Sequence, residues 1–237
     1  MRKIQGSSNY LKNQVIGNLS KAALSLILTF SLFLLEVYVV LYTGQFSAFK
    51  LIGFLFAVVP FVAFNFYLHK YHVYNGGWQG EKQVTKILGS SLSDDYYLIN
   101  DLYLREGGGD IDHVVLAPSG VFVLETKNWS GKIICQGDTW QRPGKRALNS
   151  NPSHQVKRNV EKIKRIIENS KVTFTHVWVE GIVVLANRTV TVNLNNPSVP
   201  VLKLIELPNY IVSQGGSRSL STEQLEAIGR QIVADKV

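Results

Sequence analysis

Two long apolar stretches occupy the first third of the chain. Between Ala22 and Tyr42 the only charged residue is Glu36, and between Phe46 and Leu68 it is Lys50. Each stretch spans about 20 residues, the length that a helix needs to cross a bilayer. A signal peptide has a shorter apolar core with no second span directly after it, and a buried hairpin of a soluble protein keeps a polar face. The pattern predicts two transmembrane helices.

Basic residues flank this hairpin on one side only. Residues 1–21 contain four Lys or Arg and no acid, and Lys70 follows the second span, whereas residues 43–45 carry no charge. Because positive charge marks the cytoplasmic side, we expect a multi-pass protein of the cell membrane with both termini in the cytoplasm. Residues 1–21 would form a cytoplasmic basic tail and residues 22–70 the transmembrane hairpin. The single cysteine, Cys135, agrees with a reducing compartment.

Shorter periodic segments follow the hairpin. A flexible break at residues 75–77 is expected before a helix over residues 78–88, which Gly89 should end. The last helix should begin at Ser221, where Gln224 completes a capping box. Between these helices we expect strands over residues 96–104, 109–116 and 121–127, a ribbon over 132–140, a helix over 152–169, and strands over 178–185 and 199–205. This order predicts one α/β (α+β) domain over residues 77–237, a mixed sheet flanked by helices.

The central hairpin of this domain is rich in carboxylates. Its turn runs from Ala117 through Pro118 to Gly120, and if Ala117 faces Gly120, then Asp112 lies opposite Glu125. Two carboxylates at cross-strand spacing repel each other unless a cation lies between them. A hard divalent cation such as Mg²⁺ uses one or two carboxylates with water and substrate phosphate. The pattern therefore predicts a cation site on this hairpin.

A lysine follows the second carboxylate by two residues. Because strand side chains alternate between faces, Lys127 should project from the same face as Glu125, within reach of an attacking water or a phosphate oxygen. His113 should then point to the opposite face from Asp112, where a structural histidine is the expected role.

Several short motifs around this hairpin occur together. They are Gly80-Glu81, Ile111-Asp112-His113 with the following valines, the Pro118 to Val123 turn and strand, Glu125-Thr126-Lys127-Asn128 with Gly131, and Asn151-Pro152 with Gln155. In these motifs residues 77–190 resemble the nuclease-related domain (NERD) family. That family is a branch of the PD-(D/E)XK phosphodiesterase superfamily, which has a restriction-endonuclease-like fold.

The resemblance implies a role for each matching residue. Asp112 and Glu125 would bind Mg²⁺ or Mn²⁺, Lys127 would position the hydrolytic water, and Glu81 would lie beside the same metal. Gln155 would border the site. Two plainer interpretations stay open: an exposed glutamate in the first turn of a helix for Glu81, and an ordinary polar helix position for Gln155.

Charge is unevenly divided in the soluble part. Residues 71–127 contain four basic and eight acidic residues, whereas residues 128–171 contain ten basic and three acidic ones. This asymmetry suits an enzyme that acts on a polyanion, although a solvated surface explains it equally well. Trp129 and Trp140 would either stack on unpaired bases or pack in the core. The candidate phosphate contacts are Lys145, Arg146, Lys157, Arg158, Lys162, Lys164 and Arg165.

These observations together predict a membrane-anchored, metal-dependent nuclease that hydrolyses nucleic acid on the cytoplasmic side, with DNA as the expected substrate. A non-catalytic module on the same fold, tethered to the lipid bilayer and binding nucleic acid or a protein, is the alternative.

Overall fold

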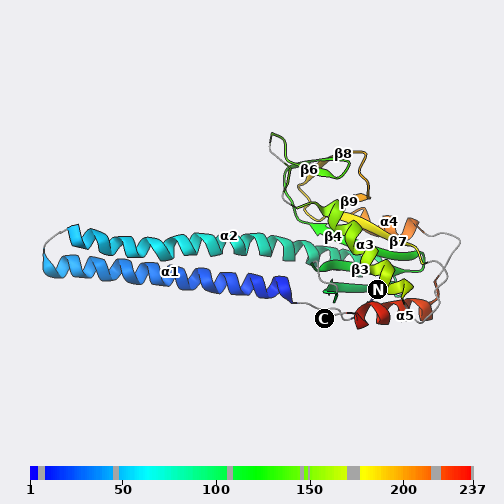
Figure 1. The fold of residues 1–237 in the computed structure, drawn as a ribbon, viewed down its shortest axis with the longest axis horizontal. Coiled ribbons are helices and arrows are strands. Elements are labelled where there is room, and N and C mark those ends of the chain that lie inside the picture. Colours follow the sequence, from blue (N-terminus) through cyan, green and yellow to red (C-terminus); the bar gives the residue numbers. More distant parts are fainter. Residues whose placement is uncertain are drawn as a thin grey trace. The chain divides into compact units, whose positions relative to one another are not determined.

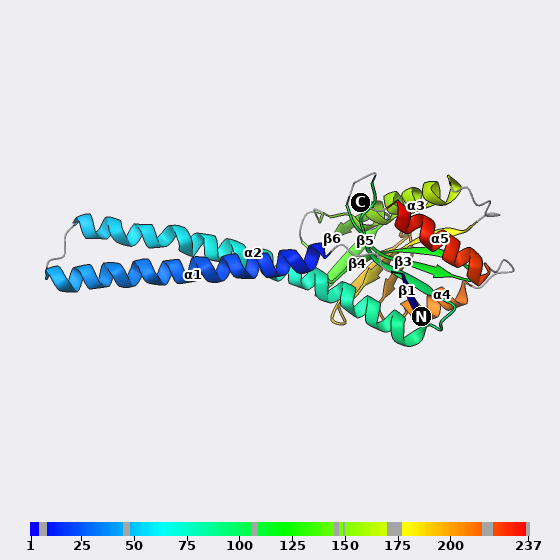
Figure 2. The same cartoon turned by 90° about the horizontal axis from the view of Figure 1, so that it is seen from below.

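A computed structural model describes residues 1–4, 9–44, 48–105, 109–144, 147–148, 150–169, 177–214 and 220–235 (Figures 1 and 2). The chain divides into two compact units. One consists of Asn9–Trp78, and the other combines Met1–Ser8 with Gln79–Val237.

The first unit is built from two long helices. They are α1 (Tyr10–Thr43) and α2 (Ala48–Ser91), and both are long and apolar enough to cross a membrane. Many of their large apolar side chains are exposed, as a lipid-facing surface requires. Helix α1 stops at Gly44, which adopts a left-handed conformation with φ of 61° and donates its N–H to the carbonyl of Val40.

Helix α2 is longer than the sequence predicts. It continues through Asn75, Gly76 and Gly77 and past Gly89, so both the predicted break and the predicted helix end are wrong. A glycine inside a helix costs about 1 kcal/mol relative to alanine, and cooperative extension from the long helical segments on either side outweighs that cost. As a result, Glu81 lies in the interior of a helix and not in its first turn.

The second unit is organised around a six-stranded mixed sheet. The order across the sheet is β1-β2-β3-β4-β7-β9. The pairs β2/β3 and β3/β4 are antiparallel, whereas the pairs β1/β2, β4/β7 and β7/β9 are parallel. The strands are β1 (Arg2–Ile4), β2 (Tyr97–Leu102), β3 (Ile111–Ala117), β4 (Gly120–Lys127), β7 (Val179–Leu185) and β9 (Val201–Lys203). The predicted mixed α/β architecture is confirmed.

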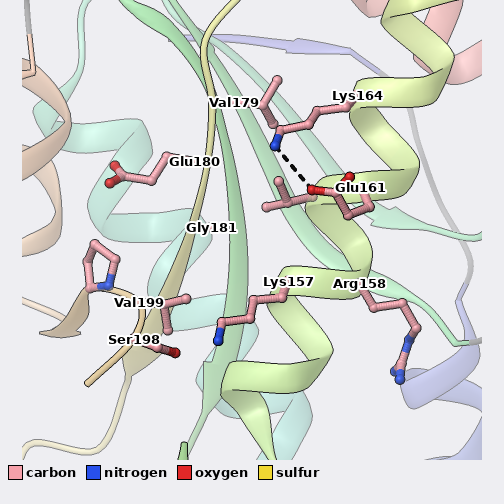
Figure 3. Close-up of a pocket in the computed structure, with 11 residues that line it drawn as sticks. Lys157, Arg158, Glu161, Lys164, Val179, Glu180, Gly181, Ser198 and Val199 are labelled. Atoms are coloured by element: carbon pink, nitrogen blue, oxygen red, sulfur yellow. Dashed lines mark hydrogen bonds and ion pairs between the residues drawn. The ribbon is translucent and has the colours of Figure 1, made fainter. Parts of the chain in front are cut away.

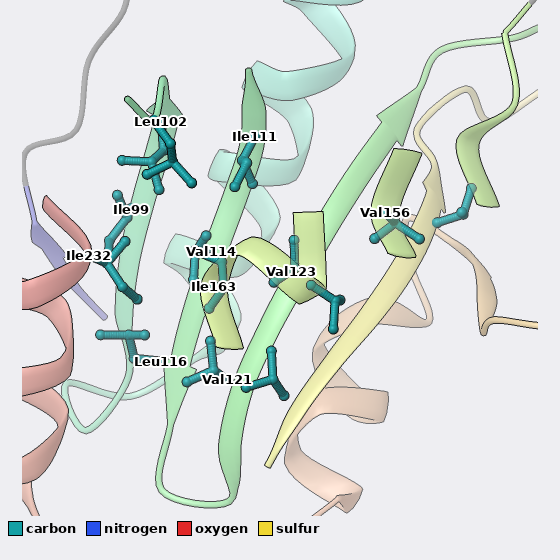
Figure 4. Close-up of a cluster of buried hydrophobic side chains, with 14 of the residues drawn as sticks. Ile99, Leu102, Ile111, Val114, Leu116, Val121, Val123, Val156, Ile163 and Ile232 are labelled. Atoms are coloured by element: carbon teal, nitrogen blue, oxygen red, sulfur yellow. The ribbon is translucent and has the colours of Figure 1, made fainter. Parts of the chain in front are cut away.

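Helices cover both faces of this sheet (Figure 2). Helices α3 (Pro152–Glu168) and α5 (Thr222–Ala234) pack on one face, where Val114, Val123 and Ile163 belong to the buried core (Figure 4). The last turns of α2 and the short α4 (Leu207–Ser213) supply the core of the other face, with Leu88 against Phe122 and its neighbours. The strands are therefore apolar on both sides.

Close packing of α3 on β7 depends on one glycine. A Cβ at Gly181 would lie 2.9 Å from methyl groups of both Val156 and Val160. The last helix, α5, begins with the predicted capping box, in which Ser221 and Gln224 bond each other's backbone N–H groups.

A smaller sheet lies beside the main one, in the order β6-β5-β8. The ribbon of β5 (Lys132–Gln136) and β6 (Thr139–Gln141) was expected, but β8 (Thr191–Asn195) was not, because its side chains are mostly exposed and its apolar signal is weak.

The sequence also gives no sign of β1. Its three residues come from the segment interpreted as a basic tail, yet they pair in parallel with Tyr97, Leu98 and Ile99 of β2. A Cβ at Gly229 of α5 would lie within 2.4 Å of Ile4 Cδ1, so the strand is packed closely against that helix. The domain therefore takes an edge strand from residues that precede α1.

Candidate functional site

The carboxylate hairpin has the register that its turn predicts. Ala117 faces Gly120, and the last pair of the ladder is His113 with Leu124. Asp112 and Glu125 are the next residues on their strands. There the backbone N–H of Thr126 donates to Asp112 Oδ2 at 2.6 Å. A hydrogen bond from the backbone to the aspartate side chain thus follows the last backbone pair of the two strands.

Glu125 and Lys127 share one face of β4, as expected. Lys127 Nζ lies 2.7 Å from Glu125 Oε1, and the Glu125 side chain is only 3% exposed. Its second oxygen, Oε2, is buried and has no hydrogen-bond partner within the described residues. Burial raises the pKa of Glu125, while the charges of Lys127 and of Arg158 on α3 oppose that rise.

Asp112 belongs to a wider group of carboxylates. Burial raises the pKa of Asp112 well above its usual value, and the negative charge of Glu125 adds to the rise. The pKa of Glu81 rises to about 9, first because of burial and then because of Asp112 and Asp101. The interpretation of Glu81 as an exposed first-turn residue is therefore wrong, and α2 brings this side chain to the carboxylates of the sheet.

Asp101 is a member of this group that the sequence analysis missed. It shares a side-chain hydrogen bond with Glu81 and has an unusual positive φ of 50°. The pairs of Asn100 with His113 and of Leu102 with Ile111 place it opposite Asp112. The pairing register of β2 with β3 would have identified Asp101. The sequence did not give this register, because no turn motif between the two strands fixes their alignment.

The residues present fit a divalent cation. Glu125 is buried and Asp112 is partly buried, the two carboxylates repel each other, and Glu125 Oε2 has no donor among the described residues. No three His, Cys, Asp or Glu side chains among the described residues converge into a ready-made metal cage. A Mg²⁺ ion does not require one, because it takes one or two carboxylates and completes its shell with water and phosphate.

His113 is separate from this chemistry. Its ring is 1% exposed, and Nδ1 lies 2.8 Å from Asn100 Oδ1. Burial lowers the pKa of His113 to about 3, so the ring is neutral at physiological pH. This agrees with the expected structural role.

Helix α3 presents two amides with unsatisfied oxygens. The helix starts at Asn151, whose side chain accepts the N–H of His154 at 3.0 Å. Gln155 lies in the first turn, and its Oε1 is buried with no partner among the described residues, as is Oδ1 of Asn159 one turn later. The sequence predicted Gln155 at the border of the site, and that remains a prediction; it gave no indication of Asn159.

The predicted phosphate contacts do not form one free row. Lys157 pairs with Asp138 at 2.7 Å, and Lys164 pairs with Glu161 at 3.1 Å. Lys162 is only 5% exposed, which corrects its assignment to the basic surface. Arg158 and Arg165 also lie on α3, whereas Lys145 and Arg146 lie outside the described residues.

Of the two tryptophans near the site, Trp140 belongs to the core and Trp129 is partly buried against it. Trp140 is 2% exposed and donates its indole N–H to Ser153 Oγ at 2.9 Å. Trp129 packs edge-on against it, with ring centroids 5.6 Å apart. Stacking of Trp140 on an unpaired base is therefore excluded in this structure.

Comparison with known proteins gives three findings. The family model described as the nuclease-related domain matches residues 76–186. An uncharacterized protein of Bacillus anthracis is 34% identical over 99 residues, which are 39% of this chain and 47% of that protein. The probable kinase PglW of Streptomyces coelicolor is 27% identical over 88 residues, which are 36% of this chain and 6% of the kinase. The chain thus spans less than half of either relative, and no solved structure matches it.

Proposed function

We propose that this chain, whose residues 76–186 match the family model described as the nuclease-related domain, is a membrane-anchored, metal-dependent phosphodiesterase that hydrolyses nucleic acid. DNA is the nucleic acid that we propose, and the cytoplasmic side is the location. The apolar helices α1 and α2 would provide the anchor, and the basic residues before and after them favour that orientation.

One observation supports the proposal most directly. Glu125 is buried, with one oxygen held by Lys127 and the other without a donor in the described part of the chain, and its charge acts on a second, partly buried carboxylate, Asp112. Such an arrangement is costly unless a cation completes it. If the Lys127–Glu125 ion pair had only a structural role, a second carboxylate, Asp112, would not be needed beside it.

Each side chain has a distinct proposed task. Asp112 and Glu125 would hold Mg²⁺ or Mn²⁺, which supplies Lewis-acid stabilisation of the negative charge that develops on the phosphate. Lys127 would orient the attacking water and donate to a phosphate oxygen. Glu81, whose raised pKa keeps its carboxyl protonated near neutral pH, would act as a hydrogen-bond donor to the groups around it.

The test compares cleavage of labelled single-stranded and double-stranded DNA by the whole chain in detergent micelles. The whole chain is needed because β1 lies before the transmembrane helices, and a fragment that begins after them would lack an edge strand. We expect cleavage with Mg²⁺ or Mn²⁺ and loss of cleavage with EDTA or in Asp112→Asn. Cleavage that survives both the chelator and the substitution would overturn the mechanism.

A non-catalytic module is the second candidate. The observation in its favour is that, in the described part of the chain, no three metal-binding side chains converge on one point. If the chain binds DNA in a salt-dependent manner but turns over none with any divalent cation, this second function holds.

A further inference from the structure

A pocket of about 480 Å³ lies between α3 and β7, with the segment Ser198–Pro200 on its far side (Figure 3). Its volume is in the range of pockets that hold small organic ligands, about 300–1,000 Å³. None of the roles proposed above for Asp112, Glu125 and Lys127 uses this pocket. Its charged lining residues are three cations, Lys157, Arg158 and Lys164, and two carboxylates, Glu161 and Glu180.

The pocket combines an apolar surface with cations around it. Val160 of α3, Val179 of β7 and Val199 supply the apolar surface. Glu180 also belongs to the lining, but Figure 3 shows its side chain turned away from α3, and its carboxylate accepts from the Tyr210 hydroxyl at 3.1 Å instead. A ligand with a flat apolar part and a negative charge matches this lining, because the apolar part can lie against the valines and the charge can contact the cationic side chains.

The cations are available to such a ligand. The ion pairs of Lys157 with Asp138 and of Lys164 with Glu161 involve half-exposed lysine side chains, 43% and 40% exposed. Pairs of this kind contribute little to stability, so their ammonium groups exchange partners readily for a phosphate. Arg158 is exposed and forms no ion pair with another described residue.

The pocket is adjacent to the carboxylate site along the sheet. Gly181, which lines the pocket, pairs with Val123 of β4, and Val183 pairs with Glu125. The two positions are therefore two residues apart on neighbouring strands, roughly 7 Å along the strand direction. Arg158 connects them, because it lines the pocket and its charge also acts on Glu125.

We propose that this pocket receives an unpaired nucleotide of the strand whose phosphodiester lies at Asp112 and Glu125. The base lies against the valines, and Lys157, Arg158 and Lys164 neutralise the neighbouring phosphates. The proposal rests on the proposed phosphodiesterase function and specifies its substrate class, single-stranded nucleic acid or an unpaired strand end. A paired base cannot leave its stack to enter the pocket without an energetic cost.

The experiment measures binding separately from cleavage. A fluorescein-labelled single strand of about a dozen nucleotides, and its duplex, are titrated with the full chain in detergent micelles with EDTA, and anisotropy gives the Kd. We expect tighter binding of the single strand, and Lys164→Glu should weaken it by about tenfold. Lys86→Glu is the matched control, because Lys86 is exposed on α2 and does not line the pocket. A second variant, Val199→Asn, changes the apolar surface without changing charge and should also weaken single-strand binding.

The outcomes separate the two proposals. Equal loss in Lys164→Glu and Lys86→Glu, or equal affinity for duplex and single strand, would overturn the nucleotide pocket. If binding depends on the pocket but Mg²⁺ and Mn²⁺ support no cleavage, the phosphodiesterase proposal fails and the pocket stands as a binding site. Matching thermal midpoints of the variants and the parent chain exclude misfolding as the cause of lost binding.

Discussion

Lys127 Nζ lies 2.7 Å from Glu125 Oε1, and the two residues are separated by a single residue on β4. The pairing leaves Oε2 of the same carboxylate buried and without a partner among the described residues. The lysine therefore satisfies one oxygen of the Glu125 carboxylate and leaves the other without a donor in the described part of the chain. In the proposed site this second oxygen would bind a cation, and the first two predictions test that proposal.

Replacing Lys127 by alanine should reduce DNA cleavage by roughly a hundredfold or more, because a positioned side chain at the reacting group typically contributes that much. Single-strand binding with EDTA should change far less. The measurement is the initial cleavage rate of labelled DNA with Mg²⁺ under the same conditions for both proteins. Lys203→Ala, at an exposed position of β9, is the control and should retain full activity. An unchanged rate in Lys127→Ala would show that the ammonium has no catalytic role.

Mg²⁺ or Mn²⁺ should stabilise the folded domain. A cation that binds only the folded state contributes about 2.7 kcal/mol when its free concentration is about a hundred times its Kd. The measurement is the thermal unfolding midpoint with EDTA and with increasing cation. The double variant Asp112→Asn, Glu125→Gln should lose this response because both proposed carboxylate ligands are gone. Equal responses of the two proteins would contradict the site.

Stability of the metal-free domain should fall as the pH rises. The folded pKa of Glu81 is about 9 and its ordinary value is 4.5, so between these values the folded state binds a proton that the unfolded state has released. Unfolding therefore becomes easier from about pH 5 toward pH 9. The thermal midpoint across this range should decline less steeply in Glu81→Gln, whose amide stays neutral. Glu168→Gln, at an exposed position of α3, should keep the parental slope, and a parental slope in Glu81→Gln would refute the assignment.

Adding one methyl group at Gly181 should destabilise the domain by about 1–3 kcal/mol, because the new Cβ would lie 2.9 Å from Val156 and Val160 and force α3 away from β7. Gly89→Ala is the matched control. It lies in α2 with nothing within 4 Å of its Cβ position, and should stabilise by about 0.5–1 kcal/mol. Chemical denaturation gives both values, and two changes of the same sign would be inconsistent with close packing at Gly181.

The edge strand β1 should contribute to stability although the two long apolar helices separate it from the rest of the domain in the sequence. Ile4→Asp would place a charge against α5 near Gly229 and should cost about 1–3 kcal/mol. Lys3→Asp, at an exposed position of the same strand, should cost little. The comparison uses thermal unfolding of the full chain in detergent. Equal stability of the two variants would mean that β1 does not pack on the sheet in solution.

The sequence by itself determined the features that depend on local chemistry. The Pro118-containing turn specified the register of β3 and β4, and strand alternation then placed Glu125 and Lys127 on one face. Ser221 and Gln224 specified the start of α5. The length and composition of the two apolar stretches were sufficient to predict α1 and the apolar part of α2.

The tertiary structure decided the features that depend on contacts between distant residues. Only packing of α2 against the sheet brings Glu81 to Asp112, and only the β2/β3 register adds Asp101. The strand β1 has too few residues to carry a periodic signal, so its pairing with β2 is favoured by a preformed sheet edge and not by its own sequence. Helix α2 continues through its glycines because cooperative extension outweighs local preference. Local rules thus specified the carboxylate hairpin, whereas the surroundings that shift its pKa values came from the fold.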